Sequence, residues 1–163
     1  MKYKPTVYLE TTIPSYLTSR PSGNVVVAGE QLLTHDWWET RRSQFDCYVS
    51  ELVIDEAGAG DPERAQERLG LVSNLNLLII DDATMQLAQA LIGSGLIPAK
   101  ATADATHVAI SSRYGIDFLL TWNCRHIANA QILRELSKVV KENGYALPVV
   151  CTPTELMGGV KDD

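Results

Sequence analysis

Three acidic residues stand where a shared cation could bind them. Glu10 directly follows the apolar, β-prone run Val7-Tyr8-Leu9, Glu56 borders the buried side of a short helical segment, and Asp104 lies in the first turn of a later one. Carboxylates that converge in one crevice repel each other unless a cation or protons compensate their charge. Carboxylate oxygens suit Mg²⁺ or Mn²⁺, which activate water and stabilise the transition state of phosphoryl transfer. If the three acids converge, they would therefore suit a divalent cation of the kind used in phosphoryl transfer.

Each acid also has a purely structural explanation. Glu10 could be a solvated loop carboxylate that caps the next turn. Asp104, in a first helical turn, would interact well with the helix dipole. Glu56 could be one more surface charge, as its acidic neighbours are explained by helix starts or exposure: Glu51, Asp55 and Asp61. The pattern of acids alone leaves both explanations open.

The elements that must position these acids alternate between strands and helices. Short apolar runs predict strands at residues 6–9, 47–50, 77–80, 118–121 and 147–151, and we expect the third to be buried. Helical spacing and caps predict helices at 25–42, 51–57, 61–75, 82–93, 102–114 and 128–143, with Thr102 as a cap and a surface loop at 18–24. This alternation predicts an α/β three-layer α/β/α sandwich with a mainly parallel central sheet.

In such a sheet the ligand crevice lies beyond the carboxyl ends of the strands. Three polar segments follow predicted strands directly: Glu10-Thr11-Thr12, residues 51–56, and Thr121-Trp122-Asn123. We therefore expect the candidate site at this edge of the sheet.

Length and composition set the remaining bounds. The 163 residues fit one domain, expected at residues 1–157, with a flexible tail at 158–163. No signal peptide or membrane span is visible, so a cytoplasmic protein is expected. Cys47, Cys124 and Cys151 are widely spaced and suggest neither a disulfide framework nor a zinc site. The net charge of −6 argues against a broad basic nucleic-acid-binding surface, unless acids gather at a cation site and basic residues cluster locally.

The residues from Val7 to about Ala128 resemble the PIN-domain nucleases, and among them toxins of the VapC kind. Four segments carry the resemblance in the family's order, although each alone is of low specificity: residues 8–17 (YLETTIPSYL), 50–56 (SELVIDE), 104–109 (DATHVA) and 117–123 (DFLLTWN). The resemblance implies a PIN-like fold and an Mg²⁺- or Mn²⁺-dependent ribonuclease whose products carry 5′-phosphate and 3′-hydroxyl ends. It also implies RNA as substrate and an antitoxin protein as a partner.

The resemblance implies a role for each matching residue. Glu10 stands where most members have Asp, and Glu56 and Asp104 are the second and third acids, so these three would be the catalytic and metal-binding residues. Asn123 stands where a fourth Asp is common, which favours one metal ion over two. Thr11, Thr12 and Thr121 would support the carboxylates.

Other residues near these segments have less defined roles. Arg125 and His126 are expected at a helix start near the site. The Arg125 guanidinium and the Lys100 ammonium could bind a substrate phosphate. His107 is expected on the side of its helix away from the apolar face, as an exposed or interface histidine rather than a catalytic base. Adjacent aromatic residues cannot both face one core, so one of Trp37 and Trp38 should be partly exposed. The exposed ring could mark a homodimer or partner-protein surface, or it could simply be partly covered by Arg41 or Arg42.

Two other functions are compatible with parts of the sequence. A degenerate PIN domain that binds RNA or protein without cutting is favoured by Glu10, Asn123 and the acidic net charge. A nucleotide-binding or phosphatase-like domain shares the alternating architecture, but the chain lacks a phosphate loop, and Gly58-x-Gly60 follows a helix instead of opening one.

Overall fold

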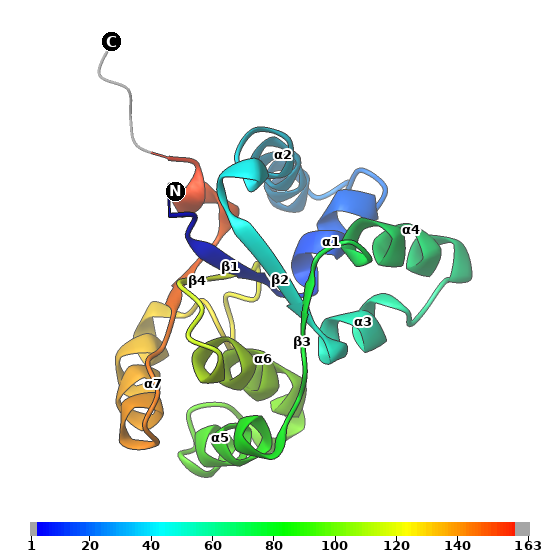
Figure 1. Ribbon diagram of the computed structural model, residues 1–163. Helices are drawn as coiled ribbons and strands as arrows, with labels where there is room; N and C mark the ends of the chain where they lie inside the picture. The colour runs from blue at the N-terminus through cyan, green and yellow to red at the C-terminus, as the bar shows by residue number, and fades with distance from the viewer. Residues whose placement is uncertain (1–2, 159–163) are drawn as a thin grey trace.

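A computed structural model describes residues 3–158, and five parallel strands form its central sheet. The strands are β1 (Thr6–Leu9), β2 (Asp46–Ser50), β3 (Asn76–Leu78), β4 (Phe118–Leu120) and β5 (Val149–Cys151), in the order β3-β2-β1-β4-β5 (Figure 1). β1 pairs with both β2 and β4, so Val7, Tyr8 and Leu9 are fully buried at the centre. The predicted tail at 158–163 lies outside the described residues except for Gly158.

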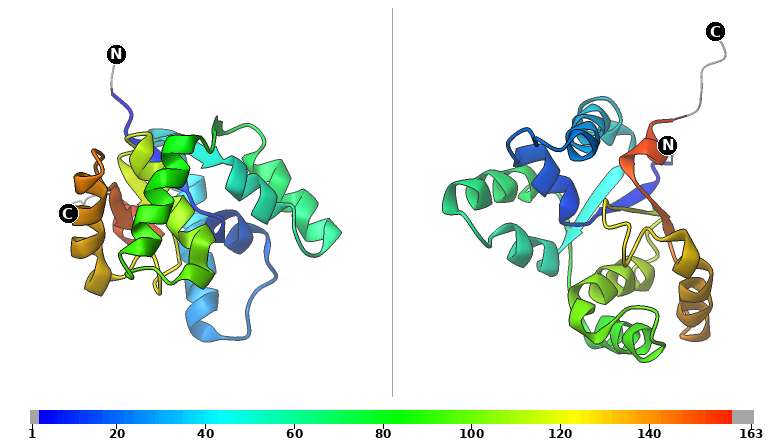
Figure 2. Two further views of the ribbon diagram at one scale, coloured as in Figure 1. Left: turned by 90° about the horizontal axis from the view of Figure 1, so that it is seen from below. Right: turned by 180° about the vertical axis from the view of Figure 1, so that it is seen from behind.

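Helices cover both faces of the sheet. They are α1 (Thr12–Thr18), α2 (Val25–Thr40), α3 (Glu51–Ala57), α4 (Pro62–Val72), α5 (Asp82–Gly93), α6 (Thr102–Arg113) and α7 (Ala130–Glu142), with short 3₁₀ turns η1 (Arg42–Gln44), η2 (Ala99–Ala101) and η3 (Pro153–Leu156). Figures 1 and 2 show α1, α2 and α4 on one face and α5, α6 and α7 on the other. The predicted three-layer α/β/α class is confirmed.

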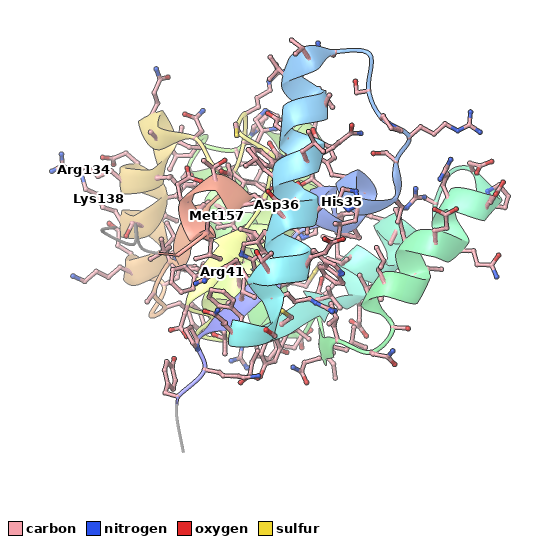
Figure 3. The ribbon with its side chains drawn as sticks, turned by 90° about the horizontal axis from the view of Figure 1, so that it is seen from above. His35, Asp36, Arg41, Arg134, Lys138 and Met157 are labelled. Carbon is pink, nitrogen blue, oxygen red and sulfur yellow. The ribbon has the colours of Figure 1, made fainter. Side chains whose placement is uncertain are left out.

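Helix α7 is amphipathic, with one side buried and the other exposed. In α7, Leu136 and Val140 are buried, while Arg134 and Lys138 project outward (Figure 3). The last turn of α2 lies near η3, where Figure 3 shows Arg41 and Met157. No helix among residues 3–158 has both the length and the apolar character needed to cross a membrane.

The neighbouring tryptophans have different environments. Trp37 is fully buried, whereas Trp38 is partly exposed and the Arg42 guanidinium lies 4.1 Å from its ring centre. Partial exposure of one of the two is confirmed, and the arginine cover is the simpler of its two explanations. Cys47 is buried in β2, and all three cysteines are free thiols, as expected.

The structure corrects three predictions about individual elements. Residues 77–80 do not form a buried strand: β3 is an edge strand that ends at Leu78, and Leu77 and Ile79 are 53% and 60% exposed. Thr102 does not cap α6, because Ala101 occupies the cap position and the Thr102 hydroxyl donates to the Ala99 carbonyl. No helix was predicted between the strand at residues 6–9 and the helix that begins at residue 25, yet α1 forms there.

Pro14 does not prevent α1, since it lies in the first turn. The first amide groups of a helix lack intrahelical acceptors, so a missing N–H costs nothing there. This helix carries Thr12 and Tyr16 on the same side, one turn apart.

Asp117 ties the start of β4 to the start of β1. Its Oδ2 accepts hydrogen bonds from the Tyr3 hydroxyl (2.6 Å) and from the Thr6 amide (2.9 Å) and hydroxyl (3.1 Å). The Tyr3 hydrogen bond, followed by that of the Thr6 amide, lowers the pKa of Asp117 below its ordinary value of 3.8. The ionised carboxylate is therefore the form that the fold stabilises.

We expect Asp117→Asn to reduce the free energy of unfolding at pH 6 by about 1 kcal/mol, after allowance for solvent screening. A group whose pKa is lowered in the fold stabilises it above the ordinary pKa, and this contribution is lost as pH falls through the lowered value. The difference from wild type should therefore shrink towards pH 3, as urea unfolding at both pH values would measure. A deficit that is equal at the two pH values would contradict the assignment.

Candidate functional site

Glu10 lies at the carboxyl end of the central strand with its side chain buried. Its amide donates to the Leu120 carbonyl (3.1 Å), which extends the β1–β4 ladder by one residue, and Glu10 is only 4% exposed. The hydroxyls of Thr12 and Thr121 each donate to its Oε1 at 2.6 Å, and the Thr12 amide lies 3.2 Å from Oε2. Such donors are what a buried carboxylate requires.

Glu56 meets Glu10 at a single histidine nitrogen. The His107 Nε2 atom lies 2.6 Å from Oε1 of Glu56 and 4.0 Å from Oε2 of Glu10. The Thr11 hydroxyl also donates to Oε1 of Glu56, at 2.7 Å. Burial would raise the pKa of Glu56, but the hydrogen bond and charge of His107, together with the Thr11 hydrogen bond, lower it overall. Two of the three predicted acids thus face one bridging imidazole.

The structure corrects the prediction that His107 is exposed, since this residue is 1% exposed. All eight residues from Ala105 to Ser112 are buried because α6 lies between the sheet and α5 (Figure 1). A helix enclosed on both sides has no free face for a polar residue, so the ring must find partners inside. The sequence signal that could have found it is Tyr8, a polar side chain in a central strand that also needs a buried partner.

Tyr8 and Ser50 hold the other ring nitrogen of His107. The Tyr8 hydroxyl lies 2.7 Å from His107 Nδ1 and 2.8 Å from Ser50 Oγ, which in turn accepts from the Val53 amide at 3.3 Å. Burial raises the pKa of Tyr8, so its hydroxyl keeps its proton. If Ser50 donates to Tyr8 and Tyr8 donates to Nδ1, every proton has an acceptor, and Nε2–H is left to donate to Glu56.

Asp104 is held by a different histidine. Its Oδ2 lies 2.9 Å from Nδ1 of His126, and the His126 amide donates to Oδ1 of Asn123 at 3.0 Å. The Asn123 amide donates to the Thr121 hydroxyl at 2.9 Å, and Thr121 is the residue that binds Glu10. A chain of hydrogen bonds therefore connects Asp104 to Glu10.

The three acids are linked but not gathered into one ligand set. Among residues 3–158, no group of three or more His, Cys, Asp or Glu side chains is close enough to hold a metal ion. The donor chemistry nevertheless suits a hard cation, because Oε2 of Glu56 and Oδ1 of Asp104 accept no hydrogen bond from the described residues. Joint metal binding by Glu10, Glu56 and Asp104 stays a prediction.

The predicted phosphate-binding cations lie outside these contacts. Lys100 in η2 and Arg125 are both exposed. Arg125 and His126 do not start a helix as predicted, because residues 124–127 form turns and α7 begins at Ala130, with Asn129 as its cap. The carbonyl of Asn123 is already engaged by the His126 amide, so its local role is to shape this turn.

Comparison with solved structures relates the fold to that of a known protein. The chain superposes on a chain in the crystal structure of VapBC2 from Rickettsia felis bound to a promoter DNA fragment, with a TM-score of 0.57. The match covers 90% of this chain and 98% of that one, at 15% sequence identity. The fold is PIN-like.

Other comparisons add nothing to the PIN-like fold. A match to tyrosyl-tRNA synthetase from Archaeoglobus fulgidus complexed with L-tyrosine covers 92% of this chain and 55% of that one at 14% identity, with a TM-score of 0.38. No family model and no curated protein matches the sequence.

Within the PIN-like fold, the four segments of the sequence resemblance meet around β1. Residues 8–17 run from β1 into α1, residues 50–56 from β2 into α3, and residues 117–123 cross β4 into the turn that binds Glu10. Residues 104–109 belong to α6, whose His107 bridges the first two segments. Segments that are far apart in the sequence therefore contact one another in the fold.

Proposed function

We propose that this protein is a metal-dependent endoribonuclease. The observation that carries the proposal is the pair Glu10 and Glu56, whose carboxylates converge on His107 at the carboxyl edge of a PIN-like parallel sheet. Two acids at one partly enclosed position indicate a place that favours a cation. This is also the edge at which open α/β sheets bind ligands.

Glu10, Glu56 and Asp104 would hold Mg²⁺ or Mn²⁺. When bound, the metal would supply an activated water and charge stabilisation for in-line hydrolysis of a phosphodiester. Thr12 and Thr121 fix the Glu10 carboxylate through hydrogen bonds, and Thr11 does the same for Glu56. Lys100 and Arg125 would contact the substrate phosphate, which their exposure permits.

The proposal extends to partners and setting. The structural neighbour is part of a VapBC2 complex bound to promoter DNA, which supports an antitoxin partner for this chain. On this view residues 1–157 form a single domain of a cytoplasmic toxin, able to form homodimers, that acts on RNA. Co-expression with a neighbouring gene product and co-purification would test the antitoxin part.

A second candidate is a PIN-like module that binds RNA or protein without cutting it. Two contacts favour it: His107 is hydrogen-bonded to one carboxylate oxygen of Glu56, and His126 is hydrogen-bonded to one carboxylate oxygen of Asp104. Glu10 in place of the usual Asp, and Asn123 in place of a fourth acid, point the same way.

Incubation of the purified chain with end-labelled RNA distinguishes the two candidates. The nuclease should produce shorter fragments with Mn²⁺ or Mg²⁺ and none with EDTA, and the new 5′ ends should carry phosphate. Cleavage that survives EDTA would reject the metal mechanism. RNA retention without cleavage at any Mn²⁺ concentration would reject the nuclease in favour of the binding module.

A further inference from the structure

A cleft of about 740 Å³ lies beside the starts of the strands, at the end of the sheet opposite the candidate site. Its walls come from the residues before β1, the end of η1, the first residue of β4, and η3. Arg41, the residue that ends α2, also lines it, and Figure 3 shows Arg41 at that end of the helix. Small-molecule sites typically have volumes of roughly 300–1,000 Å³. The cleft is therefore large enough for a small organic ligand.

One wall of the cleft is aromatic and apolar. Phe45 and Phe118 meet edge to face, with ring centroids 6.0 Å apart and an interplanar angle of 88°, and the buried Leu156 also lines the cleft. Phe45 packs in addition on the fully buried Trp37, with 5.8 Å between the ring centroids. The core thus fixes this wall, while both phenylalanines stay partly exposed. Such a surface suits the flat, apolar part of a ligand.

The charge of the cleft is opposite to that of the whole protein. Of the nine described residues that line it, Lys4 and Arg41 are cationic and none is acidic, although the net charge of the chain is −6. Within residues 3–158 neither of these cations forms an ion pair. Asp117 is hydrogen-bonded to Tyr3, which also lines the cleft, but it does not itself line the cleft. The two positive charges are therefore available to an anionic ligand.

Arg41 is held in place without a hydrogen-bonded partner. A Cβ built on Gly158 would lie 2.5 Å from Nη2 of Arg41, so the guanidinium packs closely against the glycine backbone. The Nε atom of Arg41 is buried and has no hydrogen-bond partner, while the side chain as a whole is only partly buried. A partly desolvated guanidinium without an acceptor is unfavourable, and the oxygens of an anion would offset that cost.

We propose that this cleft binds a small aromatic carboxylate. The carboxylate would pair with Lys4 and with the planar fork of Arg41, which matches two carboxylate oxygens, while the ring would lie against Phe45 and Phe118. A single negative charge suits a cleft with an apolar wall, because a phosphate dianion costs more to desolvate. The site shares no residue with the candidate acids and does not depend on the proposed nuclease function.

An NMR titration of the isotope-labelled chain, followed through its backbone N–H signals, tests the site. The probes are phenylacetate and phenylacetamide, which have the same ring with and without the charge, and inorganic phosphate, which has charge without a ring. Phenylacetate should bind in the millimolar range and shift the signals of Phe45 and Leu156 but not that of Asp104. Phenylacetamide and inorganic phosphate should each bind at least about fivefold more weakly.

Three variants assign the binding to the two cations. Arg41→Gln should weaken phenylacetate binding about tenfold, because a charged hydrogen-bonded pair is lost. Lys4→Gln should weaken it about threefold, since Lys4 is exposed. Arg134→Gln is the matched control, because Arg134 is an exposed arginine of α7 that does not line the cleft, and binding should be unchanged (Figure 3). Thermal unfolding checks that Arg41→Gln is folded, and if it is not, Lys4→Gln decides.

The outcomes separate this site from the proposed nuclease. Equal affinity for phenylacetate and phenylacetamide, or unchanged binding by folded Arg41→Gln, rejects the site. The absence of shifts around the cleft at phenylacetate concentrations well above millimolar rejects it as well. Glu10→Gln should keep the wild-type affinity for phenylacetate, whether or not the chain cleaves RNA. Weaker binding by Glu10→Gln would place the ligand at the candidate acids and reject the cleft.

Discussion

Glu10→Gln should lower the rate of Mn²⁺-dependent RNA cleavage by about 100-fold or more while leaving the fold in place. The glutamine amide oxygen can still accept the hydroxyls of Thr12 and Thr121, so only the longer contact of 3.2 Å from the Thr12 amide to the second oxygen is lost. What disappears is one negative charge from the pair that faces His107. Loss of about 3 kcal/mol of metal-dependent stabilisation of the transition state corresponds to this change in rate.

The measurement is initial cleavage rate at saturating Mn²⁺, accompanied by urea unfolding in EDTA. Glu63→Gln is the matched control, because Glu63 is an exposed glutamate in the first turn of α4 and should lose neither rate nor stability. Cleavage by Glu10→Gln at the wild-type rate would remove Glu10 from the site. A large loss of stability would instead assign it a structural role.

Much of this site was predictable because it lies at strand ends. The apolar runs before Glu10 and before Thr121 predict two strands of one parallel sheet, whose carboxyl ends lie at the same edge. The structure shows that these strands are neighbours and places the Thr121 hydroxyl 2.6 Å from the Glu10 carboxylate. The shared edge therefore follows from the fold class, whereas the direct contact between Glu10 and Thr121 also depends on the strand order, which was not predicted.

The histidine contacts were not predictable in the same way. His107 lies in a helix whose eight consecutive residues from Ala105 are buried, and a helical wheel finds only the small-residue side of such a helix. Which side meets α5 depends on tertiary packing, which one sequence does not encode locally. His126 reaches Asp104 because of the turn that Asn123 shapes, and that turn had the appearance of a helix start.

The edge of the sheet shows the same limit. Leu77 and Ile79 lie in an apolar run that is typical of a buried strand, yet both are more than half exposed because β3 is the outermost strand. Strand order depends on which crossovers the helices make, and apolar character alone does not distinguish a central strand from an edge strand.

His107→Leu should reduce the free energy of unfolding by about 3 kcal/mol, measured in urea with EDTA at pH 7. Leucine removes the histidine partner of the Tyr8 hydroxyl and the closest donor to the Glu56 carboxylate, and both of these groups are at least partly buried. Removing one partner of a buried polar or charged group costs far more than the hydrogen bond contributes.

A double-mutant cycle shows whether the Tyr8–His107 contact itself carries this stability. His107→Gln keeps an N–H that can reach Glu56 but removes the ring nitrogen Nδ1 that Tyr8 contacts, and Tyr8→Phe removes the hydroxyl from the other side. Because both changes break the same hydrogen bond, their costs should fail to add by about 0.5 kcal/mol or more. Tyr145→Phe serves as control, since the Tyr145 hydroxyl makes no side-chain hydrogen bond within residues 3–158 and should show no coupling to His107→Gln. Additive costs for Tyr8→Phe and His107→Gln would show that the chain from Ser50 through Tyr8 does not hold the imidazole that bridges the two acids.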